Sequence, residues 1–135
     1  MLKAVIVDAN AISRGLLNSV LMDGGYEVVG QTHTSHSALL LAARLRPQII
    51  CIAREQAEDG SGVIESLRAS SPKALIFMVS GTLDAATIQA ALARGVNGFI
   101  VKPFKADAVL KSIRNTVIAV VRKQQAGGTP DTGGA

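Results

Sequence analysis

The sequence of 135 residues is poor in aromatic residues, with three Phe, one Tyr and no Trp. Proteins that bind single-stranded nucleic acid commonly stack bases on aromatic side chains, so this scarcity disfavours that class. A core with so few rings must be built from Val, Ile, Leu and Ala, as in a parallel sheet covered by helices. The single cysteine, Cys51, excludes an internal disulfide and any cysteine-based zinc cluster.

Long apolar runs are also missing. No stretch approaches the roughly 18 apolar residues that a membrane span requires, and the run Ala4–Val7 is too short for a signal peptide. We therefore expect a cytoplasmic protein that does not bind a membrane. The length is typical of one domain with a single core.

The glycine-rich and catalytic motifs of several enzyme classes are absent. Neither GxGxxG nor GxxxxGK[ST] occurs, which excludes dinucleotide and P-loop sites, and there is no GxSxG hydrolase motif. His33 and His36 lie three residues apart and could form one edge of a metal site. No third ligand is identifiable, so a solvated helix start is the simpler interpretation.

Short apolar runs alternate with longer stretches of helical period. The predicted strands are Ala4–Val7, Tyr26–Val29, Ile49–Ile52, Ala74–Val79 and Phe99–Val101. The predicted helices run from Ile12 to Leu21, Ser35 to Arg46, Val63 to Ala69, Asp84 to Arg94, and Lys105 to about Lys123. In the first helix, Ile12, Leu16, Leu17, Val20 and Leu21 are expected to form one apolar stripe. The alternation predicts an α/β fold, a parallel five-stranded sheet with helices on both faces.

Open parallel sheets bind ligands outside the carboxyl ends of their strands. The residues expected there are Asp8, Ala53, Ser80 and Lys102. Residues 124–135 contain four of the glycines and no apolar period. We therefore predict a domain over residues 1–123, followed by a disordered tail or linker remnant.

Four blocks resemble response-regulator receiver domains, in the family's order and at family-like spacing. They are Val5–Asp8, Pro47–Ile52, Phe77–Gly81 and Lys102–Phe104, and Ala93–Phe99 is similar to the family's stretch before its final strand. The resemblance covers about residues 2–121. It implies the flavodoxin-like, doubly wound strand order 2-1-3-4-5 and a role in two-component phosphorelay signalling.

The resemblance also implies a phosphorylation pocket, which this chain keeps only in part. In the family an aspartate at the end of strand three accepts a phosphoryl group from a histidine kinase, and two acids after strand one hold Mg²⁺. Asp8, Ser80 and Lys102 match that pocket. However, Ala9 stands at the second acid and Ala53 at the acceptor. Because a methyl group has no nucleophilic oxygen, we expect no phosphorylation at Ala53 and weak Mg²⁺ binding at most.

The leading hypothesis is therefore a pseudo-receiver, a protein-interaction module that is not an enzyme and needs no cofactor. One alternative is a receiver that uses Glu55 or Asp59 as an unconventional acceptor. Another is a small-ligand sensor that uses the space left by Ala53.

The retained pocket residues have structural interpretations as well. We expect Asp8 and Lys102 to form a partly buried ion pair. We expect Ser80 to bond the local backbone, and Arg54 to neutralise the neighbouring Glu55.

Family members commonly meet partners, including themselves, through their fourth helix, fifth strand and fifth helix. Here that face is predicted to carry Arg94, Phe99, Lys105, Lys111 and Arg114. The net charge is +4, and residues 102–123 hold six basic residues and one acid. A solvated basic helix is the simplest interpretation of this charge excess. An acidic protein partner is the alternative, with a homodimer as one candidate and no direct binding of nucleic acid. The alternative is that Ala85, Ala86, Ala90 and Ala91 simply pack that helix against the sheet.

Overall fold

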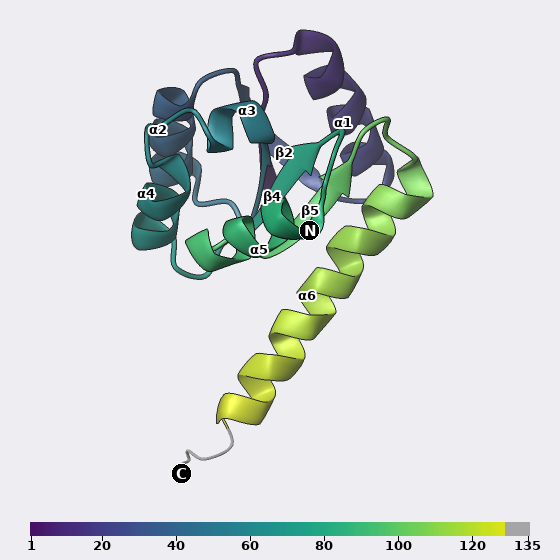
Figure 1. The fold of residues 1–135 in the computed structure, drawn as a ribbon. Coiled ribbons are helices and arrows are strands. Elements are labelled where there is room, and N and C mark those ends of the chain that lie inside the picture. Colours follow the sequence, from purple (N-terminus) through teal and green to yellow (C-terminus); the bar gives the residue numbers. More distant parts are fainter. Residues whose placement is uncertain (129–135) are drawn as a thin grey trace.

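A computed structural model describes residues 1–128 and contains a five-stranded parallel sheet (Figure 1). Its strands are β1 (Lys3–Val7), β2 (Glu27–Thr32), β3 (Ile49–Ala53), β4 (Leu75–Ser80) and β5 (Gly98–Val101). The strands pair in the order β2-β1-β3-β4-β5. The predicted fold class and strand order are thus confirmed.

Helices cover both faces of this sheet. They are α1 (Ala11–Asp23), α2 (Ser35–Leu45), α3 (Arg54–Ala57), α4 (Val63–Ser70), α5 (Ala85–Arg94) and α6 (Ala106–Gly128). Side chains of a strand alternate between the two faces, which creates two apolar cores. Val5 and Val7 face the core shared with α2 and α4, whereas Ala4 and Ile6 face the core shared with α1 and α6.

The local sequence explains where several helices begin and end. Asn10, Thr34 and Asp84 each accept a hydrogen bond from a backbone N–H in the first turn of α1, α2 and α5. Gly95 ends α5 with φ of 115°, a backbone conformation that side chains disfavour.

The structure differs from the sequence prediction in one additional helix and in the length of two segments. α3 was not predicted, because four residues are too few to display an apolar period. β2 continues to Thr32, since its pairing with β1 extends to Val7. α6 continues to Gly128 instead of ending near Lys123, because Gln and Ala after Lys123 favour helix without an apolar pattern. The predicted disordered tail was therefore wrong for residues 124–128, and residues 129–135 lie outside the described chain.

The predicted apolar stripe of α1 was also wrong in part. Leu17 and Leu21 are buried, but the side chains of Ile12 and Leu16 are 76% and 56% exposed. The five positions span about half of the helix circumference, and the sheet covers only the arc around Leu17 and Leu21. Within residues 1–128, no helix is both long and apolar enough to cross a membrane.

Candidate functional site

A small pocket of about 250 Å³ lies at the carboxyl ends of β1 and β5. It is lined by Asp8, Ala9, Asn10, Glu55, Gln56 and Lys102. Asp8 follows β1, Lys102 follows β5, and Glu55 belongs to α3 directly after β3. The parallel sheet therefore brings together residues that are up to 94 positions apart in the sequence.

Asp8 and Lys102 form the expected ion pair at this pocket. Lys102 Nζ lies 3.2 Å from Asp8 Oδ2, and the Asp8 side chain is only 8% exposed. The other carboxylate oxygen, Oδ1, accepts a hydrogen bond of 2.8 Å from the backbone N–H of Asn10. Both oxygens of Asp8 are thus engaged by the protein itself.

The residues present do not fit the Mg²⁺ that receiver domains bind. This ion takes its ligands from oxygen atoms and usually has at least one carboxylate free to bind it. Asp8 is engaged as described, and methyl groups stand at Ala9 and Ala53. The other carboxylate of the pocket, Glu55, lies exposed on the four-residue helix α3. Among residues 1–128, no group of three or more His, Cys, Asp or Glu could hold a metal ion, and His33 and His36 have no third ligand.

Ala53 and Ser80 end the two central strands beside the pocket. Ala53 is the last residue of β3 and is 1% exposed. Ser80 Oγ donates to the carbonyl of Thr82 at 2.8 Å and accepts from its N–H at 3.2 Å. The prediction that Ser80 bonds the local backbone is confirmed.

The two acids considered as unconventional acceptors lie in different places. Glu55 lines the pocket with Asp8 and Lys102. Asp59 is absent from the pocket lining, and it accepts hydrogen bonds from Ser35 Oγ at 2.5 Å and from Ser61 N–H at 2.9 Å. These hydrogen bonds, with that of Ser35 the strongest, lower the pKa of the Asp59 carboxyl. Only Glu55 is therefore placed to react at the pocket.

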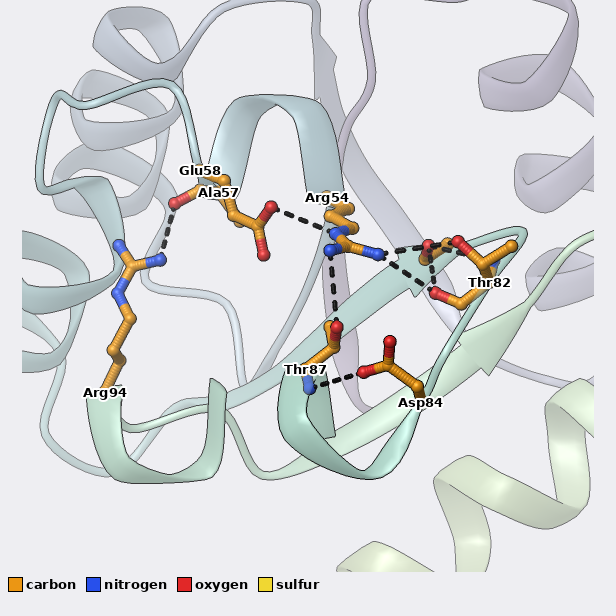
Figure 2. A network of polar contacts seen from close by, with 8 residues as sticks. Arg54, Ala57, Glu58, Thr82, Asp84, Thr87 and Arg94 are labelled. Atoms are coloured by element: carbon orange, nitrogen blue, oxygen red, sulfur yellow. Dashed lines mark hydrogen bonds and ion pairs between the residues drawn. The ribbon is translucent and has the colours of Figure 1, made fainter. Parts of the chain in front are cut away.

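The sequence suggested that Arg54 neutralises the neighbouring Glu55, but the structure pairs Arg54 with a different acid. Its Nε lies 3.0 Å from Glu58 Oε1, and Figure 2 shows its guanidinium reaching the β4–α5 loop. Nη1 donates to the Thr82 carbonyl at 3.2 Å, and Nη2 donates to Thr87 Oγ1 at 3.3 Å. Arg54 and Glu58 are four residues apart, a spacing that brings side chains together on a helix. No helix was predicted for this segment, so the sequence analysis did not consider this pair.

A second hollow, a groove of about 500 Å³, lies between β5 and the start of α6. It is lined by Phe99, Ile100, Val101, Pro103, Lys105, Ala108, Val109 and Ser112. Val101 is 54% exposed, and Ser112 Oγ donates to the Phe99 carbonyl at 2.7 Å. We call this feature the β5–α6 groove. Two predicted partner residues, Phe99 and Lys105, lie in it.

Arg94 and Arg114 do not line the β5–α6 groove. Arg94 forms an ion pair with Glu65, with Nε 2.8 Å from Oε2, and Nη1 donates to the Ala57 carbonyl at 2.8 Å. The hydrogen bond from Arg94 lowers the pKa of Glu65 to about 2. Arg114 lies near Tyr26, where burial raises the pKa of the phenol and the Arg114 charge partly offsets that rise.

This placement narrows the predicted partner surface. Ser112 faces the groove, and Arg114, two residues later, points about 200° further around α6. Lys111 is exposed between them. In α5, Ala91 is buried while Ala85, Ala86 and Ala90 are exposed, so packing against the sheet accounts for only one of these four alanines.

Comparison with known sequences agrees with this arrangement. A family model described as the response regulator receiver domain matches residues 4–114. The chain is 30% identical over 114 residues to the chemotaxis protein CheY of Listeria monocytogenes, which covers 84% of this chain and 96% of that protein. It is 28% identical over 116 residues to the chemotaxis protein CheY of Bacillus subtilis, covering 85% and 97%.

Solved structures share the fold at lower identity. The chemotaxis response regulator CheY4 of Vibrio cholerae superposes with a TM-score of 0.75 at 24% identity, covering 86% of this chain and 98% of that one. A CheY-like receiver domain protein from Methanospirillum hungatei has a TM-score of 0.78 at 18% identity, covering 91% and 98%. The match of residues 4–114 spans every strand of the sheet together with Asp8, Ser80 and Lys102, and the chain is thus a member of the response regulator receiver domain family of two-component signalling.

Proposed function

We propose that this receiver domain acts through protein contacts and is not phosphorylated at the end of β3. The observation that carries the proposal is the buried methyl group of Ala53 at the family's acceptor position. Formation of an acyl phosphate requires a carboxylate oxygen, which a methyl group lacks. Without that step the domain has no reaction to catalyse, and it is a signalling module and not an enzyme.

Independence from Mg²⁺ belongs to the same proposal. The family's metal neutralises phosphoryl oxygens, and the engaged carboxylate of Asp8 together with the exposed Glu55 of the short helix α3 is a poor ligand set for it. Lys102 supplies the charge that balances Asp8. The pocket residues then hold the ends of β1 and β5 together and bind no cofactor.

The β5–α6 groove supports a protein partner with an acidic, partly apolar surface. Phe99 and Val101 offer apolar contact, and Lys105 and Lys111 supply positive charge at or beside the groove. A second copy of the chain would bring the same positive charges to the interface. Electrostatic complementarity therefore favours a different, acidic protein over a homodimer.

A second candidate function is phosphorylation on Glu55. Its position at the pocket, beside Lys102, favours this acid over Asp59. Against it, a reacting atom must be placed within about 0.5 Å, and Glu55 lies on a four-residue helix with its side chain exposed. Because Lys102 balances Asp8, the Glu55 carboxylate leaves the pocket with a net negative charge, which disfavours an anionic small ligand and weakens that form of the sensor hypothesis.

An NMR titration tests the proposal. Amide shifts are recorded while Mg²⁺ and then beryllofluoride, a mimic of the phosphoryl group, are added to the wild-type chain. We expect no saturable shift at Asp8, Ala53, Ser80 or Lys102, because no acceptor carboxylate is available. The double substitution Ala9→Asp with Ala53→Asp restores both acids and is expected to give saturable shifts, which validates the measurement.

The variant Glu55→Gln separates the remaining outcomes. Saturable shifts in the wild type that vanish in Glu55→Gln would contradict the proposal in favour of the second candidate. Shifts that persist in Glu55→Gln would instead indicate that the pocket binds the small ligand without a covalent acceptor.

A further inference from the structure

α5 is attached to the rest of the molecule by few apolar contacts. Ala91 is its only buried residue, whereas α4, which is shorter, buries Val63, Ile64 and Leu67. Burial of large apolar side chains is what usually holds a helix on a sheet. Another interaction must therefore help to fix the position of α5.

Polar contacts with α3 supply this interaction at both ends of α5 (Figure 2). At the first turn, Arg54 of α3 donates to Thr87 Oγ1 and to the carbonyl of Thr82 in the preceding loop. At the last turn, Arg94 of α5 donates in the opposite direction, to the carbonyl of Ala57 in α3. Each helix thus contributes one guanidinium to the other.

The α3 side of these contacts is anchored in the core. Ala53, the last residue of β3, and Ala57, the last residue of α3, are each 1% exposed, and Ala57 belongs to the core shared with α2 and α4. Arg94 gains a second partner in Glu65 of α4. The guanidinium groups therefore connect α5 to elements that apolar packing already holds.

α3 also forms one wall of the pocket. Glu55 and Gln56 line it, and Gln56 Oε1 accepts a hydrogen bond of 3.4 Å from the N–H of Ala9. Arg54, adjacent to Glu55, faces the other way, toward α5. A change at the pocket that displaces α3 would consequently displace the partners of α5.

We propose that Arg54 and Arg94 form a two-ended polar brace that positions α5 and couples it, through α3, to the Asp8–Glu55 pocket. In this arrangement the guanidinium of Arg54 makes a permanent link from the end of β3 to the β4–α5 loop. Release of either end of the brace frees α5 while the sheet stays intact. Both are positioning residues, and the regulation that they provide needs no covalent modification.

Amide hydrogen exchange of the full chain tests the brace. The variants are Arg54→Met and Arg94→Met, with Arg44→Met as the matched control because Arg44 is an exposed arginine in the last turn of α2. Hydrogen bonds to charged groups contribute more to stability than those between neutral groups. Their loss should let α5 open more often, so we expect amides of Ile88–Leu92 to exchange about tenfold faster in both variants. Amides of Ile76–Met78 in β4 are expected to stay unchanged, as are all amides in the control.

A general loss of stability would give a different pattern. It would accelerate exchange in α5 and β4 alike, and that outcome, or unchanged exchange in α5, would overturn the brace. Should Arg54→Met fail to fold, Thr87→Val removes only the acceptor at the first turn of α5. That variant is expected to accelerate exchange in the first turn alone.

The coupling to the pocket has its own test. Ala9→Asp adds a second acid to the pocket that Glu55 of α3 also lines, and the like charges repel. We expect it to shift the amide signals of Thr82 and Thr87 in the wild-type background, and to leave them unshifted when Arg54→Met is also present. Equal shifts in both backgrounds would contradict the coupling. All these measurements use the free chain, so their failure leaves the proposed absence of phosphorylation intact.

Discussion

The proposed function rests on single side chains. Ala53 and Ala9 carry methyl groups where the family resemblance implies carboxylates, and Lys102 forms an ion pair with Asp8. The sequence predicted this ion pair, because the resemblance places both residues at one pocket. It did not predict the direction in which Arg54 and Arg94 point, since a long side chain takes the partner that the fold brings near it.

The Asp8–Lys102 pair gives a prediction at the same scale. Lys102→Ala leaves the buried Asp8 carboxylate without its ion-pair partner, and we expect a loss of about 1–3 kcal/mol in the free energy of unfolding. The loss should be smaller by about 1 kcal/mol in an Asp8→Ala background, because the two residues interact. Urea unfolding of the two single variants, the double variant and the wild type measures this coupling. Independent losses would show that the ion pair contributes nothing.

At the scale of elements, helix ends and strand centres were more predictable than short or solvent-facing segments. The starts of α2 and α4 were predicted to the residue because capping and flexible residues precede them. α3 escaped prediction because its four residues are organised by β3 and by contacts with the neighbouring loops. Ile12 and Leu16 of α1 are exposed because the sheet covers only part of the apolar face of this helix. The sequence of a helix does not specify how much of its apolar face the neighbouring elements cover.

Replacing either of two glycines by alanine is expected to change the stability of the chain, in opposite directions. Gly15 lies inside α1 with nothing within 4 Å of an added Cβ, so Gly15→Ala should stabilise the chain by about 0.5–1 kcal/mol through helix propensity. Gly98 begins β5, where an added Cβ would lie 2.7 Å from the Phe77 ring and 2.8 Å from Thr116 Oγ1. Gly98→Ala should therefore destabilise the chain by about 1–3 kcal/mol. Urea unfolding of both variants checks the signs, and stabilisation by both substitutions would contradict the packing at Gly98.

At the scale of the whole molecule, charge and shape together define the interaction surface. Figure 1 shows α6 running past the end of the sheet, and the β5–α6 groove lies near the start of this helix. The positive charges at Lys105 and Lys111 remain exposed. They oppose the approach of a second identical surface.

Self-association measures this effect. We expect the chain to sediment as a monomer at low salt over a wide range of protein concentration, because like charges repel across the groove. Val101→Lys serves as the comparison, since it adds a further positive charge on the exposed apolar rim of the groove. A wild-type dimer that Val101→Lys dissociates would identify a second copy of the chain as the occupant of the groove.

The sequence by itself determined the parallel sheet with helices on both faces, because apolar period and the short connections between elements restrict the topology. Its resemblance to receiver domains added the strand order, and the matching residues Asp8, Ser80 and Lys102 mark the pocket. Only the tertiary structure decided that Glu55 and not Asp59 lines that pocket, and that Arg94 and Arg114 turn away from the β5–α6 groove. The physical reason is that a local pattern specifies which face of an element is apolar, whereas the partner of an exposed polar side chain depends on elements that meet only after folding.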